Sequence, residues 1–302
     1  MKFAAIDIGS NAVRLLFCNV LEKNTPPSFK KAELIRVPIR LGEDSFILGK
    51  ISEKKIQKLI TAMKAFKHLI DVYDAVAYRA CATSAMRDAE NRWDIIQRIR
   101  KEAGIKVELI SGRAEADIIY SNHIAENLSE NNSYLYIDVG GGSTEVTLFS
   151  KNKSIVSQSF DIGTIRMLHN QVSKESWNYF KNWVKEVTKD YKPLIAIGSG
   201  GNINKLFRMS GRKDGKPLPY KRLKMIAEDL QSYTLEERIA LLGLNPDRAD
   251  VIIPASKIVL AVMKAAEIEQ IIVPLMGLSD GIVHQLYETY KKEKKKKKKL
   301  AA

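Results

Sequence analysis

The sequence is poor in cysteine, histidine and tryptophan, with two, four and three of them among 302 residues. Cys18 and Cys81 form no CxxC pair, which argues against a disulfide framework or a cysteine-rich metal site and favours buried free thiols. No run of about 18 apolar residues occurs, so no transmembrane helix and no membrane partner are expected. The chain starts directly in a predicted strand at 3–8 without a signal peptide, so we expect a cytoplasmic protein.

Charge, by contrast, is abundant and one-sided, with a formal net charge of +14. Half of it lies in the segment 291–299, which has eight lysines and one glutamate, so the remaining body is also basic. A basic body favours a polyanionic partner such as a nucleotide, polyphosphate or an acidic surface. The lysine-rich segment fits either a solvated helix end or an arm that concentrates an anionic polymer. No basic motif with interleaved aromatics occurs, so no specific nucleic-acid partner is expected.

Two glycine-rich hairpins with the same frame organise the chain. Residues 6–17 and 137–149 each consist of an apolar strand, an aspartate, a glycine-rich turn and a second strand rich in β-formers. One such hairpin is a weak signal, because Asp-x-Gly occurs in many ordinary turns. Two copies predict a duplicated domain with two phosphate loops that face each other across a cleft.

The remaining pattern supports a duplication of an α/β layout. In each half, three strands precede alternating helices and strands, as in the ribonuclease H-like arrangement. A polar segment at 127–133 divides the halves, which gives predicted domains at 1–126 and 127–302. The strands are predicted at 3–8, 12–20, 31–37, 75–78, 106–110, 134–139, 144–150, 154–160, 194–197 and 270–274. The helices are predicted at 52–69, 91–103, 112–125, 174–190, 220–230, 234–241, 247–268 (kinked by Pro254) and from 279 onward.

The turns of both hairpins have the composition of anion-binding loops. Glycines reach positive φ, so their backbone N–H groups can surround a phosphate, and neighbouring hydroxyls add donors. Asp138 and Glu145 flank the second turn, and two carboxylates beside a phosphate call for a cation between them. Mg²⁺, with Mn²⁺ as the alternative, prefers such oxygen ligands. The predicted phosphate-binding residues of the two turns are Gly9, Ser10, Asn11, Gly140, Gly141, Gly142, Ser143 and Thr144.

Three charged side chains outside the turns are further candidates. Arg14 leaves the first turn and grips a phosphate if it faces the cleft; otherwise it lies on a solvated strand face. Arg87 follows a buried strand, where α/β folds place ligands, although the preceding Thr83 and Ser84 also fit a plain helix cap. Glu115 lies in the first turn of a predicted helix, where it either accepts a proton from water or merely complements the helix dipole.

These residues belong to signatures that resemble the exopolyphosphatase/guanosine pentaphosphate phosphohydrolase (Ppx/GppA) family. The signatures occur in family order over nearly the whole chain, and the resemblance is therefore specific. They are Ala5–Arg14, Ala82–Asn91, Ile110–Ala116, Ile137–Glu145, Ile197–Asn202 (which adds Gly198 and Gly200 as phosphate-binding candidates) and Arg248–Pro254.

The resemblance implies an actin-like ATPase (sugar kinase/Hsp70/actin) superfold of two ribonuclease H-like domains around a central cleft. It also implies hydrolysis of the terminal phosphate of inorganic polyphosphate or of guanosine pentaphosphate. The sequence does not decide the oligomeric state, and a homodimer is one option. Carried over by position, Glu115 is the catalytic base, and Asp138 and Glu145 lie near the metal.

The sequence departs from the family pattern in three places. Ala114 stands where the family usually has a glutamate, and Ser279 stands where an arginine is common. The extra C-terminal domains of longer members have no counterpart here, which favours short polyphosphates as substrates if those domains hold long chains. A kinase or chaperone-like ATPase of the same superfold, and a non-catalytic polyphosphate or (p)ppGpp sensor, remain as alternatives.

Overall fold

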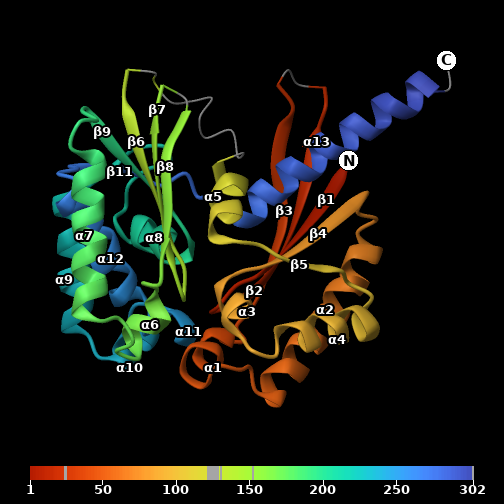
Figure 1. The fold of residues 1–302 in the computed structure, drawn as a ribbon, viewed down its shortest axis with the longest axis horizontal. Helices are drawn as coiled ribbons and strands as arrows, with labels where there is room; N and C mark the ends of the chain where they lie inside the picture. Colours follow the sequence, from red (N-terminus) through yellow and green to blue (C-terminus); the bar gives the residue numbers. More distant parts are fainter. Residues whose placement is uncertain (24–25, 121–128, 130, 152, 301–302) are drawn as a thin grey trace. The chain divides into compact units, whose positions relative to one another are not determined.

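The computed structural model describes residues 1–23, 26–120, 129, 131–151 and 153–300, and the chain folds as two units (Figure 1). The first unit contains Met1–Asn122 together with Gly277–Ala302, and the second contains His123–Met276. The predicted boundary at 126/127 lies outside the described residues. The position of the C-terminal helix α13 (Leu278–Leu300) in the sequence had indicated the second unit. In the structure this helix belongs to the first unit.

The first unit is built on a five-stranded sheet in the order β3-β2-β1-β4-β5. β1, β2 and β3 form an antiparallel meander, while β4 and β5 run parallel to β1. This is the order expected for a ribonuclease H-like layout. The strands are β1 (Lys2–Ile8), β2 (Val13–Leu21), β3 (Ser28–Val37), β4 (Ala77–Ala82) and β5 (Val107–Leu109).

The two faces of this sheet bury different helices, because alternate side chains of a strand point to opposite faces. Ala4, Ile6 and Ile8 of β1 join the apolar core that α2 (Glu53–Val72) and α4 (Arg92–Ala103) cover. On the other face, the Phe3 ring makes edge contacts with Tyr287 and Tyr290 of α13, at centroid distances of 6.1 and 5.8 Å. These aromatic contacts explain why α13 belongs to the first unit.

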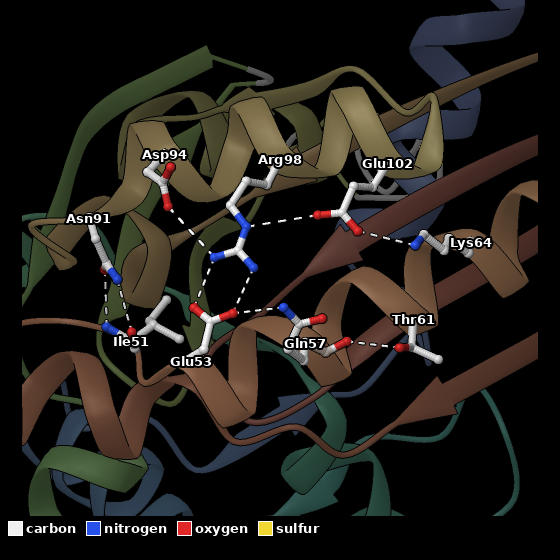
Figure 2. Close-up of polar contacts among 9 residues, drawn as sticks. All are labelled: Ile51, Glu53, Gln57, Thr61, Lys64, Asn91, Asp94, Arg98 and Glu102. Atoms are coloured by element: carbon white, nitrogen blue, oxygen red, sulfur yellow. Dashed lines mark hydrogen bonds and ion pairs between the residues drawn. The ribbon is translucent and has the colours of Figure 1, made fainter.

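Figure 2 shows that α2 and α4 are also linked at the surface. Both nitrogens at the tip of Arg98 donate to the Glu53 carboxylate, at 2.9 and 2.7 Å, and Gln57 donates to the same group. Asn91 exchanges two hydrogen bonds with the backbone of Ile51. These contacts fix the helical layer on the face opposite to α13.

The second unit repeats this topology in a six-stranded sheet of order β10-β11-β9-β6-β7-β8. β6, β7 and β8 form the antiparallel meander, β9 and β11 run parallel to β6, and β10 pairs with β11 at the edge. The strands are β6 (Ser133–Val139), β7 (Thr144–Ser150), β8 (Lys153–Phe160), β9 (Leu194–Ser199), β10 (Leu218–Pro219) and β11 (Gln270–Ile272).

Helices pack their apolar residues on the Leu135, Ile137 and Val139 face of β6. The long ones are α7 (Lys174–Thr188), α8 (Gly201–Met209), α9 (Tyr220–Ser232) and α12 (Ile252–Ala265). The single kinked helix predicted at 247–268 is wrong: α11 (Pro246–Ala249) and α12 are separate, and Pro254 lies in the first turn of α12, where a missing N–H is tolerated. α10 (Leu235–Ala240) begins with a capping box formed by Thr234 and Glu237.

Several short helices near the glycine turns were not predicted, because five to eight residues show too little periodicity. They are α1 (Leu41–Leu48), α3 (Ser84–Asp88) and α6 (Thr164–Leu168). The helix predicted at 112–125 begins as predicted with α5 (Gly112–Tyr120), and the rest of that range lies outside the described residues. Along the part of the chain that the structure describes, no helix is long and apolar enough to cross a membrane. The predicted duplicated α/β architecture is confirmed.

Candidate active site

In the first unit, a row of polar residues crosses the sheet at the end of β1. Asp7 lies directly opposite Arg14 on β2 and next to Cys81 on β4. The Arg14 guanidinium donates to the Asp7 carboxylate at 2.7 Å, and the Asp7 side chain is almost completely buried. The ion pair neutralises Asp7, and the five donors of a guanidinium leave others that could bind an anion. Arg14 is thus held in place by Asp7 rather than lying loose on a solvated face.

The first glycine turn is closed by its own backbone. Gly9 N–H donates to the Ala12 carbonyl at 3.2 Å, so this amide serves the turn rather than a ligand. The buried Ser10 hydroxyl lies 2.9 Å from the Ser84 hydroxyl at the start of α3. This pair ties the turn to α3. Thr83 is the N-cap residue of α3, and its side chain makes no capping hydrogen bond, so the alternative interpretation of a plain helix cap is wrong. Asn11 belongs to the same turn, and its carbonyl accepts from the amide of Arg40.

Arg87 and Glu115, predicted separately, lie in contact. The Arg87 guanidinium donates to the Ile110 carbonyl at 2.9 Å and reaches a Glu115 carboxylate oxygen at 3.4 Å. Ser111 begins α5, since its hydroxyl accepts from the amide of Ala114 and its carbonyl from that of Glu115. The Glu115 side chain is only 12% exposed, which is less than expected for a residue that merely complements the helix dipole at the surface.

The helix that carries Glu115 is held against α13 at one glycine. An ideal Cβ on Gly281 would lie 2.0 Å from the carbonyl oxygen of Ile118, which only glycine avoids. α13 therefore touches the backbone of α5, and the position of Glu115 depends on Gly281. A glycine in the final helix of the chain was not singled out from the sequence, because its contact is with a segment 160 residues away.

In the second unit, the equivalent row contains two carboxylates. Asp138 on β6 lies directly opposite Glu145 on β7, so both side chains project from the same face of the sheet. A Glu145 oxygen accepts from the hydroxyl of Ser159 at 2.8 Å, and Glu145 is 2% exposed. Like charges placed directly opposite each other repel, and a bound cation removes this repulsion. Ser159 is a neighbour of this site that the sequence interpretation missed.

The donor chemistry of this pair fits the predicted magnesium ion. Mg²⁺ is usually held by one or two carboxylates together with substrate phosphates and water, and Asp138 and Glu145 supply two carboxylates. No group of three or more metal-ligating side chains occurs among the residues with described positions. The pair alone therefore fits an ion that shares its coordination with a substrate rather than a fully protein-bound structural metal.

The second glycine turn, Gly140–Thr144, is fixed from behind by the segment that leads into α6. Gly140 N–H donates to the Ser143 carbonyl at 2.9 Å, which repeats the closure of the first turn. The hydroxyl of Thr144, a predicted phosphate ligand, donates instead to the carbonyl of Ile162. Arg166 Nε donates to the Gly142 carbonyl at 2.9 Å. The turn is therefore hydrogen-bonded both within itself and to the segment behind it.

The remaining two predicted glycines have local packing reasons for being glycine. Gly200, with φ of +108°, would bring a Cβ within 3.1 Å of a carboxylate oxygen of Asp138. Its absent side chain therefore makes room for Asp138. A Cβ on Gly198 would lie 2.8 Å from the side chain of Ile271, so this glycine lets β9 and β11 pack closely. Their binding of phosphate stays a prediction.

Burial also sets the pKa of the Cys81 thiol, which lies next to Asp7 in the first sheet. Removal from water raises the pKa of Cys81 to about 12; Arg79 opposes this, and the nearby carboxylates of Glu108, Asp7 and Glu115 add to it. Because β1, β4 and β5 run parallel, Asp7 near the end of β1, Arg87 after β4 and Glu115 after β5 lie toward the same edge of the sheet.

Comparison with known proteins places this arrangement in a family. The family model described as the Ppx/GppA phosphatase family matches residues 30–290. Exopolyphosphatase 1 of Mycobacterium tuberculosis is 26% identical over 305 residues, which cover 94% of this chain and 87% of the relative. The bifunctional 3-dehydroquinate synthase/phosphatase of Fusobacterium nucleatum is 32% identical over 277 residues, but the match spans only 41% of its length.

Solved structures agree with this assignment. An exopolyphosphatase from Cytophaga hutchinsonii superposes with a TM-score of 0.83 at 25% identity, over 96% of this chain and 98% of that one. The Ppx/GppA family member of Aquifex aeolicus gives a TM-score of 0.75 at 26% identity, over 96% and 98%. The signatures, the duplicated sheets and the family match lead to the same result: the chain belongs to the Ppx/GppA phosphatase family.

Proposed function

We propose that the protein is an exopolyphosphatase, which hydrolyses the terminal phosphate of inorganic polyphosphate by in-line attack of water. The observation that carries this proposal is the contact of Arg87 with Glu115 beside the Asp7–Arg14 pair. It places one nearly buried carboxylate against a guanidinium group in the unit that also carries the Asp7–Arg14 pair and the first glycine turn. The exopolyphosphatases among its relatives support the choice of polymer as substrate.

Glu115 is proposed as the general base. Its carboxylate oxygen accepts the proton of the attacking water, a step that typically contributes about 10²- to 10⁴-fold to the rate. Arg87 offsets the charge of Glu115, so that a carboxylate can lie near a phosphate anion without prohibitive repulsion. Arg14, fixed by Asp7, is proposed to bind phosphate oxygens together with the backbone amides of the first turn.

In the second unit, the turn Gly140–Thr144 is proposed to bind phosphate oxygens through its backbone amides. Asp138 and Glu145 would hold Mg²⁺, or Mn²⁺, which when bound offsets the charge of the phosphate oxygens. Phosphoryl transfer requires positioning and charge stabilisation more than covalent chemistry. The backbone amides of the turns would position the phosphate, and Arg14 and the metal ion would offset its charge.

One assay tests this function. Release of phosphate from polyphosphate, guanosine pentaphosphate and ATP is measured with and without Mg²⁺. Mg²⁺-dependent release from polyphosphate, with little from ATP, is the expected result. Preferential release from guanosine pentaphosphate would assign the alternative family activity, and release from ATP alone would favour an ATPase. Saturable binding without any release would identify a sensor.

A further inference from the structure

The second glycine turn presents its carbonyl groups to a single segment. Residues 163–166, at the start of α6, place their donors along the turn (Figure 1 shows α6 below β6 and β8). All three successive carbonyls of the turn are thereby engaged. The pairs are Thr164 N–H to Gly140 O at 3.0 Å, Ile165 N–H to Gly141 O at 2.8 Å and Arg166 Nε to Gly142 O at 2.9 Å.

The direction of the amides follows from the direction of the carbonyls. In a planar trans peptide, the C=O of one residue and the N–H of the next point to opposite sides. Because the carbonyls of residues 140–142 point toward α6, the amides of Gly141, Gly142 and Ser143 point away from it. Successive amides on one side of a turn form a concave site for an anion.

The approach of the two segments is too close for any side chain at Gly163. An ideal Cβ there would lie 2.3 Å from the Gly141 oxygen and 2.4 Å from the Gly142 carbonyl carbon, and both are backbone atoms that cannot swing aside. Gly163 is in an extended conformation, so its role is spatial and not a matter of positive φ.

The first unit uses the same arrangement, so the support of the glycine turn from behind is a repeated feature of the two units. The start of α1 donates from Gly42 N–H to the Ser10 carbonyl at 2.8 Å and from Arg40 N–H to the Asn11 carbonyl at 3.0 Å. The amides of Asn11 and Ala12 therefore face away from α1. In both units, the short helix that follows the third strand binds the back of the glycine turn.

We propose that the segment 161–166, through Gly163 and Arg166, is a positioning element that holds the turn amides toward the phosphate. Arg166 is suited to this role because its side chain is only 16% exposed and one of its terminal nitrogens lies 3.9 Å from a carboxylate oxygen of Asp161. The identity of the anion as a substrate phosphoryl group rests on the proposed function. The orientation of the amides does not, and it can be tested with inorganic phosphate.

The first experiment removes the side-chain donor. Arg166→Met is compared with Arg222→Met, an exposed arginine of α9 in the same unit, and with Arg166→Lys, which keeps a charge and a donor. Titration of the full chain with inorganic phosphate is followed by amide NMR shifts of the turn glycines. Arg166→Met should weaken binding roughly tenfold, the scale of one charge-assisted hydrogen bond, with partial recovery in Arg166→Lys. Wild-type phosphate affinity in Arg166→Met would overturn the proposal.

Kinetics separate positioning from general stability. In polyphosphate hydrolysis, Arg166→Met should raise KM more than it lowers kcat, and its thermal midpoint should remain close to that of Arg222→Met. An equal loss of activity in both arginine variants, in proportion to a lowered midpoint, would show that Arg166 only stabilises the fold.

A second variant tests the close approach of Gly163 to the backbone of the glycine turn and leaves the Arg166 side chain unchanged. Gly163→Ala should abolish the phosphate-induced shifts of the turn amides, because the two backbones must separate. Gly211→Ala is the matched control: its φ of +68° strains an alanine, but no atom of the described chain lies within 4 Å of the new methyl group. Retained phosphate shifts in Gly163→Ala would contradict the proposal.

The outcomes for function and for positioning are distinguishable. A wild-type protein that shows phosphate shifts in the turn but does not hydrolyse polyphosphate refutes the proposed substrate and supports the positioning element. A protein that hydrolyses polyphosphate while Arg166→Met and Gly163→Ala retain wild-type KM refutes the positioning element alone.

Discussion

Asp138 and Glu145 lie directly opposite each other on β6 and β7, whereas the same position in the first sheet pairs Asp7 with Arg14. The first pair neutralises itself through a contact of 2.7 Å. The second pair places two negative charges on one face. The first copy of the duplicated framework therefore pairs a carboxylate with a guanidinium group, whereas the second copy pairs two carboxylates.

Removing one charge of the second pair should reduce the response to magnesium. In Glu145→Gln, relief of the cross-strand repulsion should stabilise the metal-free protein by about 0.2–1 kcal/mol. The same change should weaken Mg²⁺ binding, so the Mg²⁺-induced rise of the melting temperature should shrink. Calorimetry with EDTA and with Mg²⁺ checks both effects, and an unchanged Mg²⁺ response would remove Glu145 from the metal site.

Glu115 should be needed for turnover but not for binding. Glu115→Gln keeps the size and one acceptor of the side chain but cannot take a proton, so kcat for polyphosphate should fall by about 10²- to 10⁴-fold. Polyphosphate affinity should stay the same or rise slightly. Glu102→Gln, which alters a surface glutamate of α4 paired with Lys64, is the matched control. A Gln variant with wild-type kcat would assign the base to another residue.

Because α13 touches α5, a substitution at Gly281 in α13 should displace Glu115 in α5. Gly281→Ala forces a methyl group against the Ile118 carbonyl and should destabilise the protein by about 1–3 kcal/mol, as overpacking does. Because α5 must shift, kcat should fall while the Mg²⁺ response of the second unit is retained. Chemical unfolding and steady-state kinetics measure the two effects. A fully active, stable variant would show that α5 tolerates the displacement.

The ion pair of Glu53 with Arg98, shown in Figure 2, should make the stability of the protein depend on pH in the acid range. Hydrogen bonds from Arg98 and then Gln57 hold the pKa of Glu53 at about 2, below its ordinary 4.5. A lowered folded pKa means that the contribution of Glu53 to stability is complete above about pH 4.5 and is lost as the pH falls toward 2. Glu53→Gln should therefore show a weaker loss of stability between pH 5 and 3 in urea titrations read by circular dichroism.

Solvent exposure keeps this effect small, and salt should reduce it. Identical pH profiles of wild type and Glu53→Gln at low ionic strength would contradict the pKa assignment. Lys64→Gln, which alters the neighbouring Lys64–Glu102 pair without touching Glu53, is the control.

The lysines at the end of α13 should affect the binding of long polyphosphate more than the rate of its hydrolysis. Lys292, Lys294, Lys295 and Lys296 are exposed, and contacts of lysines with a polyanion release counterions. Changing these four to glutamine should flatten the salt dependence of KM for long polyphosphate and leave kcat unchanged. KM measured between low and moderate salt gives the slope; an unaltered slope would support the simpler view of a solvated helix end.

The hairpins, the duplicated sheets and the pairing of polar residues with turns could be predicted from the sequence, because these features are local. An aspartate at the end of a strand before glycines is visible as a pattern of neighbours. Arg87 and Glu115 were each predicted after a strand, but their contact was not predicted, because it forms between two separate segments of the chain. The domain division failed at α13, because no local pattern shows which sheet a terminal helix will cover.

What could not be predicted is the support of the turns from behind. Gly163 and Arg166 lie 19 and 22 residues after the end of the turn that they hold, and α6 is too short to produce a periodic pattern. Gly281 meets Ile118 across a separation that no motif records. The hydroxyls of Ser10 and Thr144 looked like phosphate ligands because their partners, Ser84 and Ile162, are supplied only by the tertiary fold.

Both cysteines of the protein are buried, so their thiols should react slowly with electrophiles. Burial raises the pKa of Cys18 to about 11 and that of Cys81 to about 12, so neither side chain is a thiolate near neutral pH. Peroxides and alkylating reagents attack the thiolate form, and Cys81 is the strand neighbour of Asp7, which fixes the proposed phosphate ligand Arg14. Oxidative stress should therefore leave this phosphatase working after enzymes that depend on exposed cysteines have failed.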